Sequence, residues 1–342
     1  MFFTARVGHP LSSSLLLTFA APFLLVTLAA ADRLLGFSSA WAGWPFFISL
    51  FLIGMPHGAA DLLVSAELGS GGGWRPVLIG FMPYFAIMVL GALALALVPE
   101  FALIVFAAVT FLHFRDADYQ TLKHRAPESP SDPLLSAAGR AAIVLALPFW
   151  SSTDAAVGLL NRLLELLGAA TRVSDPSTAK LLGGIAVGLG LVFVLTSWCS
   201  RLLRRAQGEW RLVRAEAVET AGLGIGLAVL NPLFAMGVYF LAWHSLRHLR
   251  ELCSFLWPNE DHEDIPQFFL GIARIHLRSL PLLLPTIVVY AGMVVTLAKP
   301  WNVTDMALLI IVVFIVVTFP HHLQILRMFA VINLRPQAAK AA

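Results

Sequence analysis

The stretch Ala307-Leu-Leu-Ile-Ile-Val-Val-Phe-Ile-Val-Val-Thr-Phe-Pro-His321-His322 decides the fold class of this chain. It lies within an apolar segment, residues 304–331, that is long enough to cross the hydrocarbon core of a bilayer as one helix. The whole sequence has the same character, since 58% of its 342 residues are hydrophobic and 13% are charged, against roughly 25% charged in soluble domains. We therefore predict an all-α fold, a polytopic transmembrane helical bundle in which residues 1–342 form a single integral-membrane domain.

Similar apolar segments recur along the chain and predict about eight to ten membrane spans between residues 11 and 331. Residues 154–168 are shorter and predict a helix that lies in the membrane interface. The predicted spans are residues 11–31, 42–66, 76–98, 100–117, 134–150, 180–203, 214–231, 232–256, 278–298 and 304–331.

The charged residues at the ends of these spans predict the orientation of the bundle. The first span resembles a signal peptide, but its length of about 20 residues and the following Asp32-Arg33 favour a retained helix. Basic residues favour the cytoplasmic side, which places one loop and the C-terminus there. These residues are Arg201, Arg204, Arg205, Arg211 and Arg214 in the loop, and Arg327, Arg335 and Lys340 near the end.

Composition also argues against several classes of protein. The net charge of +3 is small, so no nucleic-acid partner is expected. The chain has two cysteines, Cys199 and Cys253, which argues against a disulfide framework and against a cysteine-based zinc or iron–sulfur site.

Histidine interrupts apolar sequence in four separate segments. Imidazole is costly to bury in hydrocarbon without a partner, and ionisable groups at membrane depth usually face the bundle interior and serve a function. We therefore predict one metal site in the interior of the bundle, although each motif taken singly also fits a structural histidine. The segments are Met55–Gly58 with His57, Phe111–Phe114 with His113, Trp243–His248 with His244 and His248, and Phe319–His322 with His321 and His322.

The spacing within these segments predicts which rings share a face. His244 and His248 are four residues apart, so on a helix both can reach one ion. Adjacent residues diverge by about 100° on a helix, so we expect His321 to act as a ligand or supporting donor and His322 to pack elsewhere.

Carboxylates near the histidines are expected to accept hydrogen bonds from the ring nitrogens that do not bind the metal. Asp61 is one turn after His57 and faces the same side, where a carboxylate would accept a hydrogen bond from the far ring nitrogen. Asp116 lies near the face of His113, and Asp118 is turned further round. Glu219, on the predicted span 214–231, is a further candidate to reach the site.

An all-imidazole ligand set suits iron, copper, zinc or nickel, and does not suit calcium or magnesium. Paired intramembrane histidines also bind haem axially, but two histidines one turn apart fit opposite axial positions poorly. Histidine boxes of the HxxxH and HxxHH kind occur in di-iron lipid desaturases, and only one pair here has that spacing. The residues alone leave these alternatives open.

The motifs resemble those of the Brp/Blh family of bacterial and archaeal membrane β-carotene 15,15′-dioxygenases. Residues 56–61 resemble its PHGALD-like motif, with Ala60 in place of leucine, and residues 113–118 resemble its HFGxAD-like motif, with Arg115 in place of glycine. Residues 243–248 match its WHSxRH-like motif, and Pro320-His321 matches a late PH motif. The order and spacing of the motifs agree from the second predicted span to the last. Arg115 is bulky and charged where glycine is typical, so it is expected to narrow a pocket or to alter the local field.

The resemblance implies a non-haem Fe(2+) enzyme, an oxidoreductase of the prokaryotic inner membrane. The iron would be held by His57, His113, His244 and His248, which would make these histidines the catalytic set. Central 15,15′ cleavage of β-carotene by O2 would give two retinal molecules, which a rhodopsin could receive. A carotenoid would enter from the lipid through an apolar tunnel that is lined by neighbours of the histidines, Phe111, Phe114, Tyr239, Phe240 and Trp243.

Two alternative functions remain at this point. One is another membrane non-haem iron oxygenase or desaturase that acts on a different lipid. The other is a non-enzymatic haem-binding or transport protein, although the chain has no inverted repeat of broken helices, which transporters often show.

Overall fold

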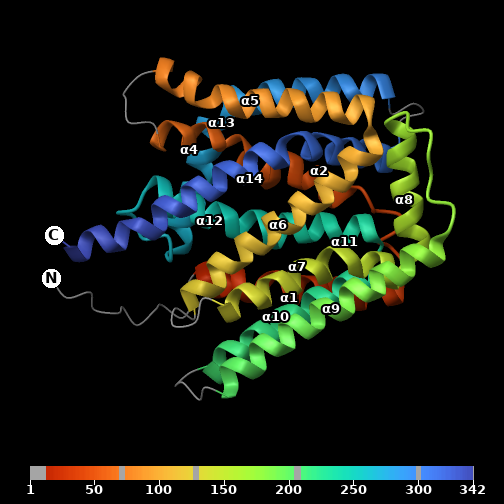
Figure 1. Ribbon diagram of the computed structural model, residues 1–342, viewed down its shortest axis with the longest axis horizontal. Coiled ribbons are helices and arrows are strands. Elements are labelled where there is room, and N and C mark those ends of the chain that lie inside the picture. The colour runs from red at the N-terminus through yellow and green to blue at the C-terminus, as the bar shows by residue number, and fades with distance from the viewer. Residues whose placement is uncertain (1–12, 69–73, 126–130, 204–208, 298–301, 342) are drawn as a thin grey trace.

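The computed structural model describes residues 13–68, 74–125, 131–203, 209–297 and 302–341 (Figure 1). Every regular element in these ranges is helical. The elements are α1 (Ser13–Leu35), α2 (Trp44–Ser49), η1 (Leu50–Gly54), α3 (Met55–Ala59), α4 (Asp61–Leu68), α5 (Trp74–Leu97), α6 (Pro99–Arg125), α7 (Ser131–Ser151), α8 (Thr153–Leu166), α9 (Pro176–Leu203), α10 (Glu209–Val229), α11 (Pro232–Tyr239), η2 (Phe240–His244), α12 (Ser245–Leu256), α13 (Ile265–Leu297) and α14 (Val303–Ala341).

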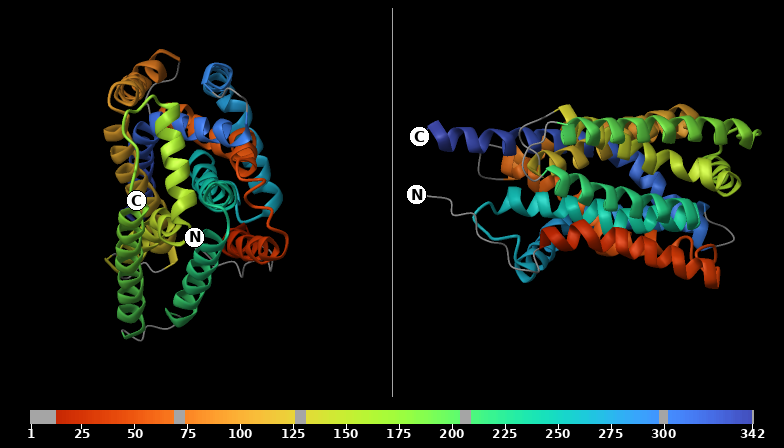
Figure 2. Two further views of the ribbon diagram at one scale, coloured as in Figure 1. Left: turned by 90° about the vertical axis from the view of Figure 1, so that its right-hand side faces the viewer. Right: turned by 90° about the horizontal axis from the view of Figure 1, so that it is seen from below.

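Most helices run along the long axis of the molecule, and α8 crosses them at one end (Figures 1 and 2). The helix predicted at residues 154–168 therefore exists and has a different direction from its neighbours. The C-terminal end of α14 lies at the opposite end of the molecule (Figure 1).

Six helical stretches in the described residues are long and apolar enough to cross a membrane, which supports a multi-pass membrane protein. Three predicted spans, residues 100–117, 214–231 and 232–256, do not meet that criterion, and the predicted span 11–31 is not tested, because its first residues lie outside the described part of the chain. The polar and charged side chains on α6, α10 and α12 are the reason for these differences, because a helix surrounded by other helices does not need an apolar surface all round. The six stretches are Trp44–Leu68, Ile79–Leu97, Pro133–Ser151, Pro176–Leu203, Ile265–Leu297 and Val303–Asn333.

Glycine lets two pairs of helices approach closely. A Cβ atom added to Gly190 on α9 would lie 2.7 Å from the backbone oxygen of Gly139 on α7. A Cβ atom added to Gly226 on α10 would lie 2.7 Å from the Leu25 Cβ atom on α1. Small residues at such contacts are typical of membrane helices, where close van der Waals packing drives association.

Two long helices of the bundle contain π-helical turns, at η1 and at η2. In such a turn the hydrogen bonds run from residue i to i+5, which inserts an extra residue and rotates the following side chains, and such turns are frequent at functional sites. Each π turn directly precedes or contains a histidine-bearing segment: His57 follows η1, and His244 is the last residue of η2.

Candidate metal centre

The local breaks in the chain explain how His57 is positioned. Pro56 lies directly after the π-helical turn η1, and its missing amide hydrogen removes one hydrogen bond of the continuing helix. Helix α3 ends at Ala59, and α4 begins at Asp61 after a single turn residue, Ala60. His57 is buried in the interior with 5% of its surface exposed.

The other predicted ligands come from α6, η2 and α12. His113 lies in α6, His244 ends η2 and His248 lies in the first turn of α12. The rings of His244 and His248 are nearly parallel, with an interplanar angle of 5° and centroids 6.4 Å apart. The Nε2 atoms of His113 and His244 are 3.1 Å apart.

His321 on α14 joins these four rings, and we refer to His57, His113, His244, His248 and His321 as the histidine cluster. Four parts of the chain that are far apart in the sequence therefore meet at one place: α3, α6, the consecutive η2 and α12, and α14. The ring centroids are 5.7 Å apart for His57–His244, 5.2 Å for His57–His248, 5.3 Å for His57–His321, 4.9 Å for His113–His244, 6.2 Å for His113–His248, 5.0 Å for His113–His321 and 5.3 Å for His248–His321.

These separations fit rings that share an ion. With ~2.1 Å between a metal and an imidazole nitrogen, ring centres lie ~3.2 Å from the metal, so two ligating rings are ~4.5 to ~6.4 Å apart. Several buried ring nitrogens of the cluster also have no hydrogen-bond partner, namely His57 Nδ1, His113 Nδ1, both nitrogens of His248, and His321 Nε2. Such groups are costly to bury alone, and a bound metal would satisfy one nitrogen of each ring.

Within the described residues, no group of three or more His, Cys, Asp or Glu side chains already has its donor atoms placed to hold a metal. The cluster therefore has the ring type and the ring spacing that suit a metal, but its nitrogen atoms do not form a ligand geometry.

Asp61 supports a different histidine from the one that helical spacing indicates. Its Oδ2 atom lies 2.8 Å from Nδ1 of His321, and its side chain is fully buried. The prediction paired Asp61 with His57 one turn earlier, but α14 packs against α4 and brings the ring of His321 within hydrogen-bond distance of the carboxylate. A proton on His321 Nδ1 that is donated to Asp61 would leave Nε2 as an acceptor toward the cluster.

Asp116 does not contact the ring of His113 through any described interaction. It pairs with Arg115, at 2.7 Å from Arg115 Nε, and lies 3.7 Å from His322 Nε2. The bulky cation of Arg115 is thus paired with its own neighbour, and it does not line the cavity described below. His322 is buried beside His113, with ring centroids 5.7 Å apart.

Asp118 and Glu219 face away from the cluster and pair with two buried arginines. Asp118 Oδ2 forms an ion pair with Arg140 Nε at 2.9 Å, and Asp118 Oδ1 accepts a hydrogen bond from Arg247 Nη1 at 3.2 Å. Glu219 accepts from Arg140 Nη1 and from Arg247 Nη2, each at 3.1 Å. We refer to Asp118, Arg140, Glu219 and Arg247 as the ion-pair network. It joins α6, α7, α10 and α12 and balances two positive charges with two negative ones.

The ion-pair network is connected to the histidine-bearing helix through Arg247. This residue lies between His244 and His248 in the sequence, and its guanidinium stacks 3.5 Å from the ring centroid of Trp243. A neighbouring pair, Arg201–Glu216, is also buried. The network therefore fixes the rotation of the segment that presents two of the five rings.

One cavity opens directly onto the histidine cluster, and we call it the site cavity. It is lined by His57, His113, His244 and His321, and its remaining walls are mainly apolar side chains from α5, α6, α13 and α14. Two of the predicted lining residues, Phe114 and Phe240, belong to it.

The prediction for Phe111, Tyr239 and Trp243 differs from the structure. They pack in a neighbouring core formed with α1, α7 and α10, and none of them lines the site cavity. The reason is helical rotation, since Phe111 is two residues before His113, and Tyr239 and Trp243 directly precede Phe240 and His244, so these side chains point to another side.

Sequence reasoning missed Arg140, Phe106 and Phe314. Arg140 stands alone within the apolar span 134–150, and an unpaired charge in a span would have indicated a buried partner. The two phenylalanines line the site cavity, and nothing in their local sequence distinguishes them from packing residues.

Comparison with known proteins adds a further observation. Residues 48–328 match the model of a family described as "Beta-carotene 15,15'-dioxygenase". The chain is also similar to "Probable beta-carotene 15,15'-dioxygenase Blh" of Halobacterium salinarum, with 28% identity over 267 residues that cover 72% of each chain. No solved structure matches the chain.

Proposed function

The chain belongs to the β-carotene 15,15′-dioxygenase family, and from this membership we propose that it cleaves the central 15,15′ double bond of β-carotene with O2. The reaction gives two molecules of retinal, and both oxygen atoms of O2 enter the products, one in each aldehyde. The enzyme would be a non-haem iron oxidoreductase of retinal biosynthesis that works within the membrane.

The observation that supports this proposal best is the histidine cluster at the wall of an apolar cavity. The four predicted ligands come from three separate parts of the chain, and their rings lie at the spacing of rings that share an ion. The matched family region contains all of them.

We propose that His57, His113, His244 and His248 hold a ferrous ion through neutral imidazole nitrogens. When bound, iron supplies the redox chemistry that lets O2 react with a polyene. His321 and Asp61 orient the cluster from the side of α14, because the Asp61 carboxylate fixes the ring through Nδ1.

The chain's own residues bind the substrate and exclude water. Phe114, Phe240 and Phe314 lie between the histidines and the apolar wall, and they would contact the polyene on both sides. Apolar walls suit a water-insoluble carotenoid that arrives from the bilayer, and they keep water from the reacting carbons.

The orientation of the protein is part of the same proposal. We place the 201–214 loop and the C-terminus on the cytoplasmic side of a prokaryotic inner membrane, because basic residues gather there. Arg204 and Arg205 of that loop lie outside the described residues.

The test is to express His57→Ala and His248→Ala variants in cells that make β-carotene, with His276→Ala as the control. His276 bonds to the carbonyl of Ile272 and lies outside the cluster. Wild type and control should contain iron and convert β-carotene to retinal, and both cluster variants should keep the orange colour and lose bound iron. Full retinal yield from either cluster variant would end its assignment as an essential ligand.

The same preparation separates the alternatives. A Soret band in purified wild type would favour a haem protein, and absence of iron would favour a transporter. An iron protein that leaves β-carotene intact but oxidises another membrane lipid would point to a different lipid oxygenase.

A further inference from the structure

A second apolar cavity of about 230 Å³ continues from the site cavity, and we call it the α8 cavity. The two cavities share their lining over five side chains, so they adjoin each other beside the histidine cluster. The shared residues are Phe106, Thr110, Phe114, Phe240 and Phe314.

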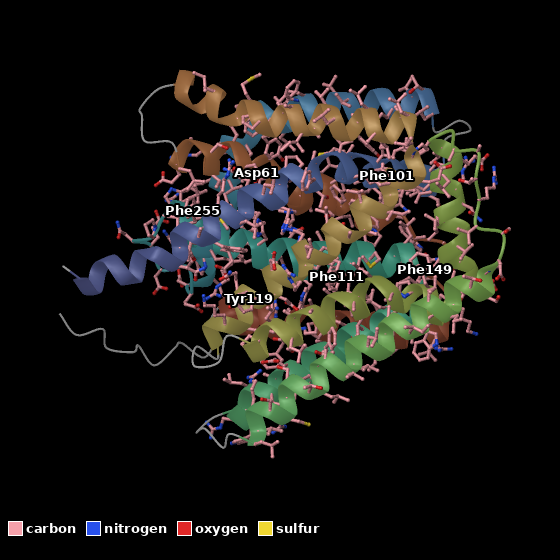
Figure 3. The ribbon with its side chains drawn as sticks, viewed as in Figure 1. Asp61, Phe101, Phe111, Tyr119, Phe149 and Phe255 are labelled. Atoms are coloured by element: carbon pink, nitrogen blue, oxygen red, sulfur yellow. The ribbon has the colours of Figure 1, made fainter. Side chains whose placement is uncertain are left out.

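The α8 cavity has a closed far end. Its walls there are Phe149 from α7 and Ala156, Leu160 and Leu163 from α8. None of the side chains that line this cavity is exposed. Phe149 lies on the α8 side of the molecule, and Asp61 lies toward the other end (Figure 3).

A third cavity, lined by α5, α6 and α14, differs in this respect. It meets the site cavity at Phe106 and Thr318, but its rim includes Leu90 and Phe101, which are 64% and 61% exposed. That cavity faces the surroundings of the bundle, whereas the α8 cavity is a dead end.

The distance from the α8 cavity to the histidine cluster corresponds to half of a carotenoid. Leu233 lines the α8 cavity, and His244 of the cluster comes eleven residues later on the same helical run, which is about 16 Å along the axis. An extended C40 carotenoid is about as long as a bilayer's hydrocarbon core is thick, ~30 Å, so half of it needs ~15 Å.

We propose that the α8 cavity receives one half of the carotenoid, and that its closed end at α8 sets which bond lies beside the histidines. The inference depends on the proposed function and adds a determinant of the cleavage position. When the leading ring stops against α8, the midpoint of the chain is at the cluster, and the other half extends outward through the smaller site cavity.

The test fills the closed end with a larger side chain. Ala156→Phe places a ring in the cavity, and Ala155→Phe is the matched control, because Ala155 is exposed on the same helix while Ala156 is 5% exposed. Ala156→Phe should lower kcat/KM for β-carotene at least about tenfold relative to the control, since a filled pocket rejects bulk. An apocarotenal with one truncated half should keep its rate, because its short end fits the remaining space.

A second variant is expected to form a new product, which a misfolded protein could not form. Leu160→Ala deepens the end of the cavity, so the substrate should slide further in, and apocarotenals of unequal length should appear beside retinal. The proposal would be overturned if Ala156→Phe and Ala155→Phe had the same substrate preference and Leu160→Ala formed retinal as its sole product.

A binding measurement keeps this result separate from failure of the proposed function. If wild type forms no retinal, the proposed function fails, and the absorption shift of added β-carotene still tests the cavity. Binding that weakens about tenfold in Ala156→Phe but not in Ala155→Phe would support the cavity as a carotenoid site, and unchanged binding would exclude it.

Discussion

The ion-pair network offers a sharp test of what holds the histidine-bearing helices in place. Glu219 is fully buried and accepts from two guanidinium groups, those of Arg140 and Arg247, at 3.1 Å each. Glu219→Gln preserves the shape of the side chain but leaves two buried positive charges facing one carboxylate, that of Asp118.

The expected loss of stability follows from this imbalance. Removing one partner of a buried ion pair costs about 3–5 kcal/mol, because the remaining charge stays buried without compensation. Replacing Arg140 as well, in Glu219→Gln/Arg140→Gln, removes one charge of each sign, so the double variant should be less destabilised than the sum of the single variants by about 0.5–3 kcal/mol.

The assay is reversible unfolding of the purified protein in mixed detergent, followed for wild type, both single variants and the double variant. Glu165→Gln is a control, since Glu165 pairs with Arg162 with 44% of its side chain exposed, and a surface pair contributes about 0–1 kcal/mol. The reasoning would be refuted if the double variant lost as much stability as the two single variants together. It would also be refuted if Glu219→Gln lost no more stability than the control Glu165→Gln.

Three further outcomes are expected. Asp61→Asn removes the charge that faces His321 Nδ1, so iron affinity, measured by competition with a chelator, should fall about 10–100-fold, with the fold retained by circular dichroism. Chelation of the metal from purified wild type should abolish retinal formation, and added ferrous ion should restore it more fully than zinc does. In the loop before α13, the hydrogen bond from Arg274 lowers the pKa of Glu260, so this carboxylate stabilises the fold above the usual value of about 4.3 and loses that effect as the pH falls through its lowered pKa. The difference in melting temperature between wild type and Glu260→Gln should therefore be larger at pH 7 than at pH 3, and a constant difference would contradict the assignment.

The sequence was sufficient to predict that the histidines converge, because that prediction needs only their placement in apolar segments. His57, His113, His244 and His248 do meet, and His321 joins them. Periodicity within one helix could also pair His244 with His248, whose rings are nearly parallel.

The sequence was insufficient wherever the answer depended on contacts between helices. Asp61 follows His57 by four residues, and helical spacing aligns them, but the Asp61 carboxylate contacts His321 of α14 instead. Arg140 and Arg247 lie 22 and 129 residues from Asp118 in the chain, and 79 and 28 residues from Glu219. No local pattern connects these residues. The predicted spans at residues 100–117, 214–231 and 232–256 do not qualify as membrane spans, because apolar length alone does not distinguish a helix facing lipid from one surrounded by protein.

The distribution of carboxylates around the cluster separates two roles that the sequence grouped together. In the proposed site a ferrous ion held by neutral imidazoles carries a charge of +2 in a medium of low dielectric constant, where an opposite charge nearby is strongly favourable. Asp118 and Glu219 cannot supply it, because both are committed to Arg140 and Arg247. Asp61 can, because its oxygen contacts a ring of the cluster at 2.8 Å. Substitution of Asp61 should therefore change metal affinity more than stability, whereas substitution of Glu219 should change stability first and metal affinity only as the helices loosen. The ratio of iron loss to stability loss can be compared between the Asp61 and Glu219 variants. If the two ratios were equal, the assignment of charge compensation to Asp61 and helix positioning to Glu219 would be wrong.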